Sequence, residues 1–79
     1  MWIRSQHGRF LTDCKYFEVE KFHEKYCVTT LSNRSNISAS LGIYSSEKKA
    51  LKVLDEIQKR TEYLYLKAFQ MPQDEDVEV

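Results

Sequence analysis

The sequence has few of the residues from which recognisable sites are usually built. Its only two cysteines among 79 residues, Cys14 and Cys27, form no close pair of the Cys-x-x-Cys kind. Zinc sites use closely spaced ligands, so these cysteines together with His7 and His23 predict no metal site. Both cysteines lie in segments rich in aromatic or β-branched residues, where we expect buried and unreactive thiols.

Long apolar runs, a signal peptide and a surplus of charge are also missing. No segment approaches the ~20 apolar residues of a membrane span, and Arg4 precedes any apolar run, so we expect a soluble, cytoplasmic protein without a membrane partner. The 12 basic and 12 acidic residues are interleaved and give a pI of about 6.7. That balance disfavours binding to duplex nucleic acid.

The length of the chain predicts one domain with a marginal core. A chain of 79 residues buries only about 60% of its unfolded surface, so we expect a homo-oligomer to supplement the core. Four acids, Asp74, Glu75, Asp76 and Glu78, lie among the last six residues. We expect residues 1–72 to form the domain and residues 73–79 to form an acidic, disordered tail.

Alternation of apolar and polar residues, together with β-branched and aromatic residue types, predicts several strands in the first half of the chain. The predicted strands are Trp2–Gln6, Phe10–Cys14, Tyr16–Phe22, Tyr26–Leu31 and Ile37–Ile43. Gly8 favours a turn between the first two, and the polar run Ser32–Asn36 is typical of a loop. We therefore expect an α+β fold with a small antiparallel sheet of about five strands.

At Ser45 and Ser46 the period of two changes to that of a helix. Serine is a favourable N-cap, and an acid in the first turn suits the positive end of the helix dipole. Ala50, Leu54 and Ile57 then recur at helical spacings. This pattern predicts one amphipathic helix over about residues 46–62, with its apolar face packed on the sheet.

The segment Tyr63–Phe69 fits both a helix and a strand. Its apolar stripe would continue the helix, while its residue types and the following Pro72 favour a final edge strand at about residues 66–71, which is the version we prefer. In either arrangement, the aromatic residues Tyr63, Tyr65 and Phe69 are typical of a protein interface.

The first strand carries the best candidate for ligand binding. Trp2, Arg4 and Gln6 share one predicted face, where an indole ring, a guanidinium and an amide suit a base, a phosphate and a base edge. The candidate ligand-binding residues are Trp2, Arg4, Gln6, Arg9, Arg34 and Asn36. The alternative is that Trp2 caps the core and Arg4 lies at its rim.

The helix start is a second place where an anion would fit. The amides of Ser45 and Ser46 lie at the positive end of the helix dipole, and Lys48 and Lys49 follow directly. Capping by the serines explains the same residues without a ligand.

No catalytic constellation can be assembled from the sequence. Glu18 and Glu20 share one strand face, which is the usual solvent-exposed face of an antiparallel sheet. Neither cysteine lies at a helix N-terminus or a glycine-framed turn that would lower the pKa of its thiol. A domain of this size rarely has a deep cleft, so we expect a protein that is not an enzyme and uses no cofactor.

Three stretches, Met1–Gln6, Leu41–Gln58 and Gln70–Pro72, together resemble small proteins of phages and prophages in Gram-positive bacteria. The resemblance carries no catalytic motif and implies a bacterial host cytoplasm and a strand just before Met71-Pro72. It favours a non-enzymatic accessory protein for counter-defence that sequesters a small phosphorylated or nucleotide-like ligand as a homo-oligomer. The alternative is an interaction module that inhibits a host enzyme through a sheet edge or the Tyr63–Phe69 segment.

Overall fold

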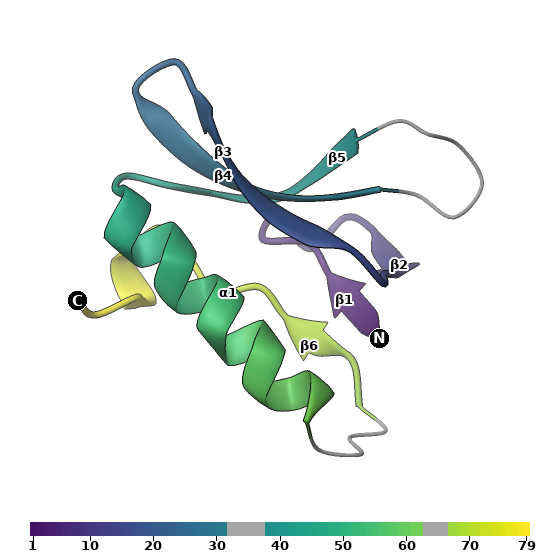
Figure 1. Cartoon of the computed structure of the whole chain (residues 1–79). Helices are drawn as coiled ribbons and strands as arrows, with labels where there is room; N and C mark the ends of the chain where they lie inside the picture. The colour runs from purple at the N-terminus through teal and green to yellow at the C-terminus, as the bar shows by residue number, and fades with distance from the viewer. Residues whose placement is uncertain (32–37, 63–66) are drawn as a thin grey trace.

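The computed structural model describes residues 1–31, 38–62 and 67–79, and it has an α+β fold. The elements in chain order are β1 (Trp2–Arg4), β2 (Leu11–Asp13), β3 (Phe17–Phe22), β4 (Lys25–Leu31), β5 (Ser38–Tyr44), α1 (Glu47–Thr61), β6 (Phe69–Gln70) and the 3-10 helix η1 (Asp74–Asp76). The strands form two three-stranded sheets (Figure 1). Within the described part of the chain, no helix has the length and apolar character needed to cross a bilayer.

The larger sheet, called sheet B here, contains β3, β4 and β5 in that order and is antiparallel throughout. Alternation along the central strand β4 directs Val28 toward the core, opposite Val19 of β3, and Cys27 toward the other face. A register shift opposite Val28 and Thr29 leaves Leu41 of β5 without a partner, and this bulge sends Leu41 into the core.

The smaller sheet, called sheet A here, contains β2, β1 and β6 in that order. Ile3 of β1 lies opposite Thr12 of β2 in an antiparallel pair and opposite Phe69 of β6 in a parallel pair. The prediction of one antiparallel sheet of about five strands is therefore wrong. Pairing β1 with β6 brings the apolar faces of both strands into the core, and period-two alternation does not indicate which strands pair.

The predicted helix is confirmed in both its start and its apolar face. Ser46 is the N-cap, and its Oγ accepts a hydrogen bond from the Lys49 N–H at 3.2 Å. Ala50, Val53 and Ile57 are buried, and α1 packs on the strands of sheet B.

The end of the helix decides between the two versions of the following segment. α1 ends at Thr61, and Glu62 is its C-cap, so a continuous helix to Phe69 is wrong. The predicted final edge strand is present as β6, although it is only two residues long. Residues 63–66 lie outside the described part of the chain, as does the predicted loop Ser32–Asn36.

Residues 73–79, predicted as a disordered tail, are instead packed against the start of α1. Val77 joins the core with 8% of its surface exposed, and η1 precedes it. The physical reason is that the apolar Val77 is buried while Asp74 contacts Ser45 and Lys49, which partly offsets the acidic charge of the segment.

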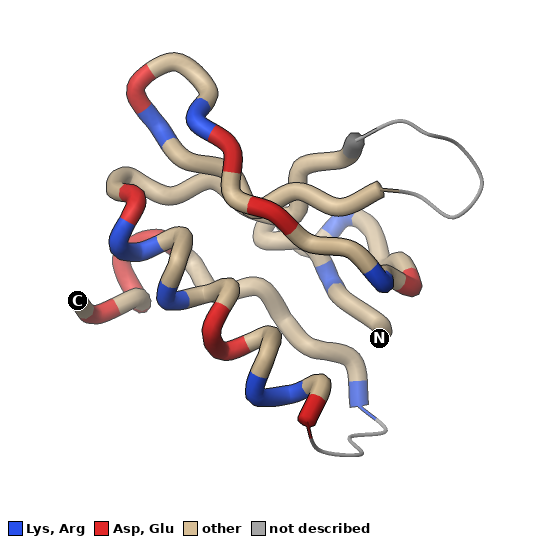
Figure 2. Tube along the Cα trace, in the orientation of Figure 1, with Lys and Arg blue, Asp and Glu red and all other residues tan. Residues whose placement is uncertain are grey.

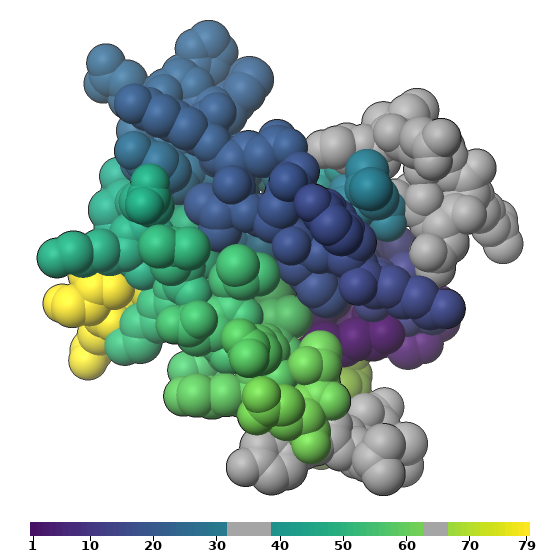
Figure 3. Space-filling model, in the orientation of Figure 1, coloured from purple at the N-terminus to yellow at the C-terminus, as the bar shows by residue number. Residues whose placement is uncertain are grey.

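One core lies between sheet B, α1 and sheet A (Figure 1). Its buried residues are Ile3, Cys14, Val28, Leu41, Tyr44, Ala50, Val53, Ile57, Phe69, Met71 and Val77. The opposite face of sheet B carries exposed apolar residues, including Phe22 and Ile43. In the space-filling view, the hairpin of β3 and β4 projects beyond α1 (Figure 3).

Candidate functional site

β1 places Trp2 and Arg4 together on the exposed face of sheet A. Trp2 has 53% of its surface exposed and Arg4 is also exposed, whereas Ile3 between them is fully buried. The two side chains thus lie on one face, as the alternation predicts. Trp2 does not cap the core, so the alternative explanation of its position does not hold.

β2 adds a leucine and a carboxylate to this face. The register sets Trp2 opposite Asp13 and Arg4 opposite Leu11, which is 46% exposed. Asp13 Oδ1 accepts a hydrogen bond from the amino group of Met1 at 2.7 Å, and this bond lowers the pKa of Asp13. The Arg4 guanidinium makes no hydrogen bond or ion pair with any described residue. We call Trp2, Arg4 and Leu11 the Trp2 face.

Gln6 lies apart from the Trp2 face because its side-chain amide is used within the fold. Its Oε1 accepts from the Ile43 N–H at 2.9 Å, and its Nε2 donates to the carbonyl oxygens of Ile43 and Pro72, each at 3.1 Å. These bonds continue the ladder of β5 and connect the two sheets. An amide engaged in this way does not bind a base edge, so Gln6 is a structural residue.

The remaining predicted site residues do not gather around Trp2 in the described structure. Arg9 is exposed in the turn before β2. Phe69, predicted at an interface, is 8% exposed and packs in the core, with the Arg60 guanidinium 5.3 Å from its ring centroid. The predicted residues outside the described part of the chain are Arg34, Asn36, Tyr63 and Tyr65.

The predicted anion site at the start of α1 is occupied by a carboxylate of the same chain. Asp74 Oδ1 accepts hydrogen bonds from the Ser45 N–H at 2.8 Å and the Ser45 hydroxyl at 3.1 Å, and it lies 3.6 Å from Lys49 Nζ. These contacts, led by the Ser45 N–H bond, lower the pKa of Asp74. Asp74 is therefore the group that this helix start binds within the chain.

The titratable groups show no arrangement for nucleophilic or metal chemistry among the described residues. Cys14 and Cys27 are free and buried, and burial raises the pKa of the Cys14 thiol, which disfavours the reactive thiolate. A hydrogen bond between Glu18 and Glu20 raises the pKa of Glu20 on the open face of sheet B. No three His, Cys, Asp or Glu side chains of the described ranges lie close enough together to hold a metal ion.

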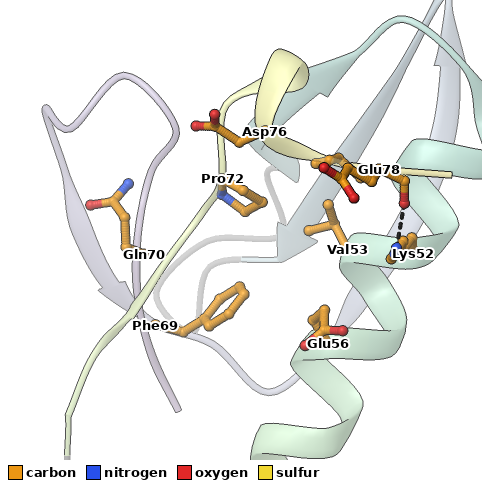
Figure 4. Close-up of a pocket in the computed structure, with 9 residues that line it drawn as sticks. Lys52, Val53, Glu56, Phe69, Gln70, Pro72, Asp76 and Glu78 are labelled. Atoms are coloured by element: carbon orange, nitrogen blue, oxygen red, sulfur yellow. Dashed lines mark hydrogen bonds between the residues drawn. The ribbon is translucent and has the colours of Figure 1, made fainter.

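A cleft of about 360 Å³ lies between α1, β6 and the C-terminal segment (Figure 4). Its apolar residues are Val53, Phe69, Pro72 and Val77, and its polar residues are Lys52, Glu56, Gln70, Asp76 and Glu78. Three of the polar residues are acids and one is basic, so this cleft does not favour the predicted phosphorylated ligand.

A second depression, of about 310 Å³, lies on the open face of sheet B. It is lined by Glu20, Phe22, Cys27, Thr29, Ser40 and Ile43. Phe22 and Ile43 are exposed, while Cys27 and Thr29 are buried. The depression is an apolar surface without a charged group of the sign that a phosphate needs.

Sequence reasoning did not identify the cleft of Figure 4. Its residues come from three separated segments, at positions 52–56, 69–72 and 76–78, and no local period indicates that these meet. Figure 2 shows basic and acidic residues interspersed along α1 and the hairpin of β3 and β4, so the described charges do not form one large basic patch.

No protein-family model, no curated protein and no solved structure matches the chain.

Proposed function

We propose that this chain is a non-enzymatic interaction module that binds a partner protein through the Trp2 face. The observation that carries the proposal is a half-exposed tryptophan beside an arginine with no described partner and an exposed leucine. Tryptophan and arginine are enriched among the residues that dominate binding energy at protein interfaces. The matching partner surface is an apolar patch that carries an acidic group for Arg4.

The edge of sheet A offers a second element of the same contact. β2 is an outer strand of the sheet, next to the β1 strand that carries Trp2 and Arg4. An outer strand has unpaired backbone groups, which a strand of a partner can bind while its side chains contact the Trp2 face. This geometry supports the sheet-edge form of the interaction module more directly than the Tyr63–Phe69 form, because Phe69 is buried in the core.

The resemblance to phage and prophage proteins provides a biological setting for this proposal. In that setting the partner is a host enzyme, and the contact inhibits it as part of counter-defence in the host cytoplasm. This step depends on association with small phage proteins and adds no residue to the site.

A second candidate function is binding of a small nucleotide-like ligand, and one observation favours it. Trp2 and Arg4 lie two residues apart on one strand, so their Cα atoms are separated by about 6.6 Å, a spacing that suits a base on the ring and its phosphate on the guanidinium. Stacking of one base contributes only about 1–3 kcal/mol. Sequestration on this open face would therefore require a second protomer to enclose the ligand in a homo-oligomer.

The test compares two double variants of the tagged chain. Trp2→Ala/Arg4→Ala removes the Trp2 face, and Leu51→Ala/Lys48→Ala removes an exposed apolar residue and an exposed cation from α1. Quantitative affinity capture from a Gram-positive bacterial lysate, followed by binding measurements with the purified partner, reports the affinity of each form. We expect the first variant to weaken binding at least about 30-fold, as loss of dominant interface residues does, and the control to bind as the wild type does.

Two outcomes would contradict binding of a partner protein through the Trp2 face. A partner that binds the Trp2→Ala/Arg4→Ala protein unchanged, while circular dichroism shows that it is folded, contradicts the proposal. A thermal shift of several degrees with a nucleotide, lost in the same variant, replaces the proposal with the second candidate function.

A further inference from the structure

We propose that the cleft of Figure 4 binds a small aliphatic cation, an amine or guanidine on a short alkyl chain. The cleft is separate from the Trp2 face and is lined by none of its residues. Its shape, its charge and the side chains that already occupy its surroundings support this ligand class independently.

The interior of the cleft suits an alkyl chain. Val53 is fully buried beneath it, Phe69 and Val77 are each 8% exposed, and Pro72 is half-buried. Figure 4 shows the Phe69 ring, Pro72 and Val53 around the interior. The volume of about 360 Å³ lies near the lower end of ligand sites, which span about 300–1,000 Å³. A short alkyl chain would cover these apolar surfaces, and burial of its methylene groups would favour binding.

The rim of the cleft favours a positive head group. The acids Glu56, Asp76 and Glu78 line the cleft, against the single basic residue Lys52, although Figure 4 shows the Asp76 carboxylate turned away from the interior. Lys52 Nζ donates a hydrogen bond to the backbone carbonyl of Glu78 and not to a carboxylate, as the dashed line in Figure 4 marks. The side chains of Asp76 and Glu78 make no hydrogen bond or ion pair with the described residues.

The third acid of the rim is paired only loosely. Glu56 Oε1 lies 3.7 Å from Lys59 Nζ, and both side chains are at least half exposed. Exposed pairs of this kind contribute little free energy, so Glu56 can exchange Lys59 for a bound cation. The rim therefore offers carboxylates to a ligand at little cost to the fold.

Two cations of the chain already contact the walls of this cleft. The side chain of Lys52 lines it, which brings an alkylammonium of the chain against the C-terminal segment. The Arg60 guanidinium lies 5.3 Å from the centroid of the Phe69 ring, which also lines the cleft. A backbone carbonyl and an aromatic ring beside the cleft thus already contact cations of the proposed class, which supports this choice of ligand.

The experiment uses three probes that have alkyl chains of similar length and differ in charge: a cation, a neutral alcohol and an anion. Pentylguanidinium, 1-pentanol and pentanoate are titrated into the full chain, and backbone amide shifts report binding at positions 52–56 and 69–78. We expect saturable shifts with pentylguanidinium, weaker shifts with 1-pentanol and none with pentanoate. Added salt should weaken the binding of the cation, since the attraction acts across an exposed rim.

Two variants with equal net charge test the carboxylates. Glu56→Gln/Glu78→Gln should weaken pentylguanidinium binding about threefold to tenfold, whereas Glu24→Gln/Glu62→Gln, which removes two exposed acids outside the cleft, should leave it unchanged. The proposal is overturned if pentylguanidinium gives no saturable shift, if 1-pentanol binds equally well, or if both variants weaken binding to the same extent. None of these outcomes depends on the Trp2 face, so they leave the proposed protein interaction separately testable.

Discussion

The two sheets of this molecule are assembled from the chain in different ways. Sheet B uses neighbouring antiparallel strands between positions 17 and 44, and β3 and β4 alone pair over six residues. Sheet A pairs positions 2–4 with 11–13 on one side and with 69–70 on the other, so its two outer strands come from opposite ends of the chain. Sheet B is local in sequence, and sheet A depends on a contact across nearly the whole chain.

Side-chain amides compensate for the short ladder of sheet A. Gln70 Nε2 donates to the Ser5 carbonyl at 3.0 Å, and Gln73 Nε2 donates to the Gln6 carbonyl at 2.7 Å. The Tyr44 hydroxyl donates to the Pro72 carbonyl at 2.8 Å, and burial raises the pKa of Tyr44, so the hydroxyl remains a donor. Glutamine and tyrosine side chains thus donate hydrogen bonds to backbone carbonyls around sheet A that its short ladder does not pair.

The largest expected change in the free energy of unfolding comes from truncating a residue on the buried side of sheet A, compared with one on the open side of sheet B. Ile3→Ala removes a fully buried side chain, and we expect it to lower the free energy of unfolding by about 3 kcal/mol. Ile43→Ala makes the same chemical change at a residue that is 43% exposed, and we expect a loss below about 1.5 kcal/mol. Urea denaturation of both variants measures the difference, and equal losses would contradict the placement of Ile3 in the core.

A smaller effect tests the bonds between the sheets. Gln6→Ala removes all three hydrogen bonds of the side-chain amide to Ile43 and Pro72, and we expect a loss of about 1–2 kcal/mol in the free energy of unfolding. Gln58→Ala is the matched control on the exposed face of α1, where alanine favours the helix slightly. Thermal denaturation distinguishes the variants, and a Gln6→Ala protein as stable as the control would show that these bonds do not join the sheets.

The smallest effect concerns the C-terminal segment and depends on pH. Because the pKa of Asp74 is lowered from 3.8 in the folded chain, its charged form stabilises the fold above that pH, and the contribution disappears as pH falls through the lower folded value. The carboxylate is about one-third exposed, so we expect less than about 1 kcal/mol.

Asp74→Asn tests this contribution. The protection of the Val77 amide, its exchange rate compared with that of an unfolded chain at the same pH, should fall in wild type as the pH is lowered from 5 to 3, and it should already be low at pH 5 in the variant. Equal protection of Val77 in the two proteins at pH 5 would mean that Asp74 does not retain the segment. Asp13→Asn is the control, since the pKa of Asp13 is also lowered but by the amino group of Met1.

The parts predicted correctly are those in which the local pattern and the tertiary structure agree. The alternation around Ile3 and the helical spacing of Ala50 and Ile57 each have one buried face, and Ser46 caps the helix through its own side chain. Trp2 and Arg4 share one face of β1, as the alternation predicts, and the structure shows that this face is exposed. For the candidate site, the sequence thus indicated two of the three residues of the Trp2 face, while Leu11 was added by the register with β2.

The failures have a common physical cause, since they depend on contacts between distant segments. Glutamine is a residue type that often binds ligands, but Gln6 lies beside β5, where its side-chain amide forms hydrogen bonds with the backbone of Ile43. The tail has the composition of a disordered segment, but Val77 and Asp74 find partners on the core and the helix start. Neither partner is near in sequence, so neither residue type nor period could indicate it.

The sequence by itself determined the periods of the strands, the start of the helix and the shared face of Trp2 and Arg4, because each depends on the free energy of burying one face of a local segment. Only the tertiary structure decided that β1 pairs with β6, that the strands divide into two sheets and that three separated segments enclose an apolar cleft with an acidic rim. These features depend on which of several similar surfaces meet, and that choice is made by packing and hydrogen bonding across the whole chain.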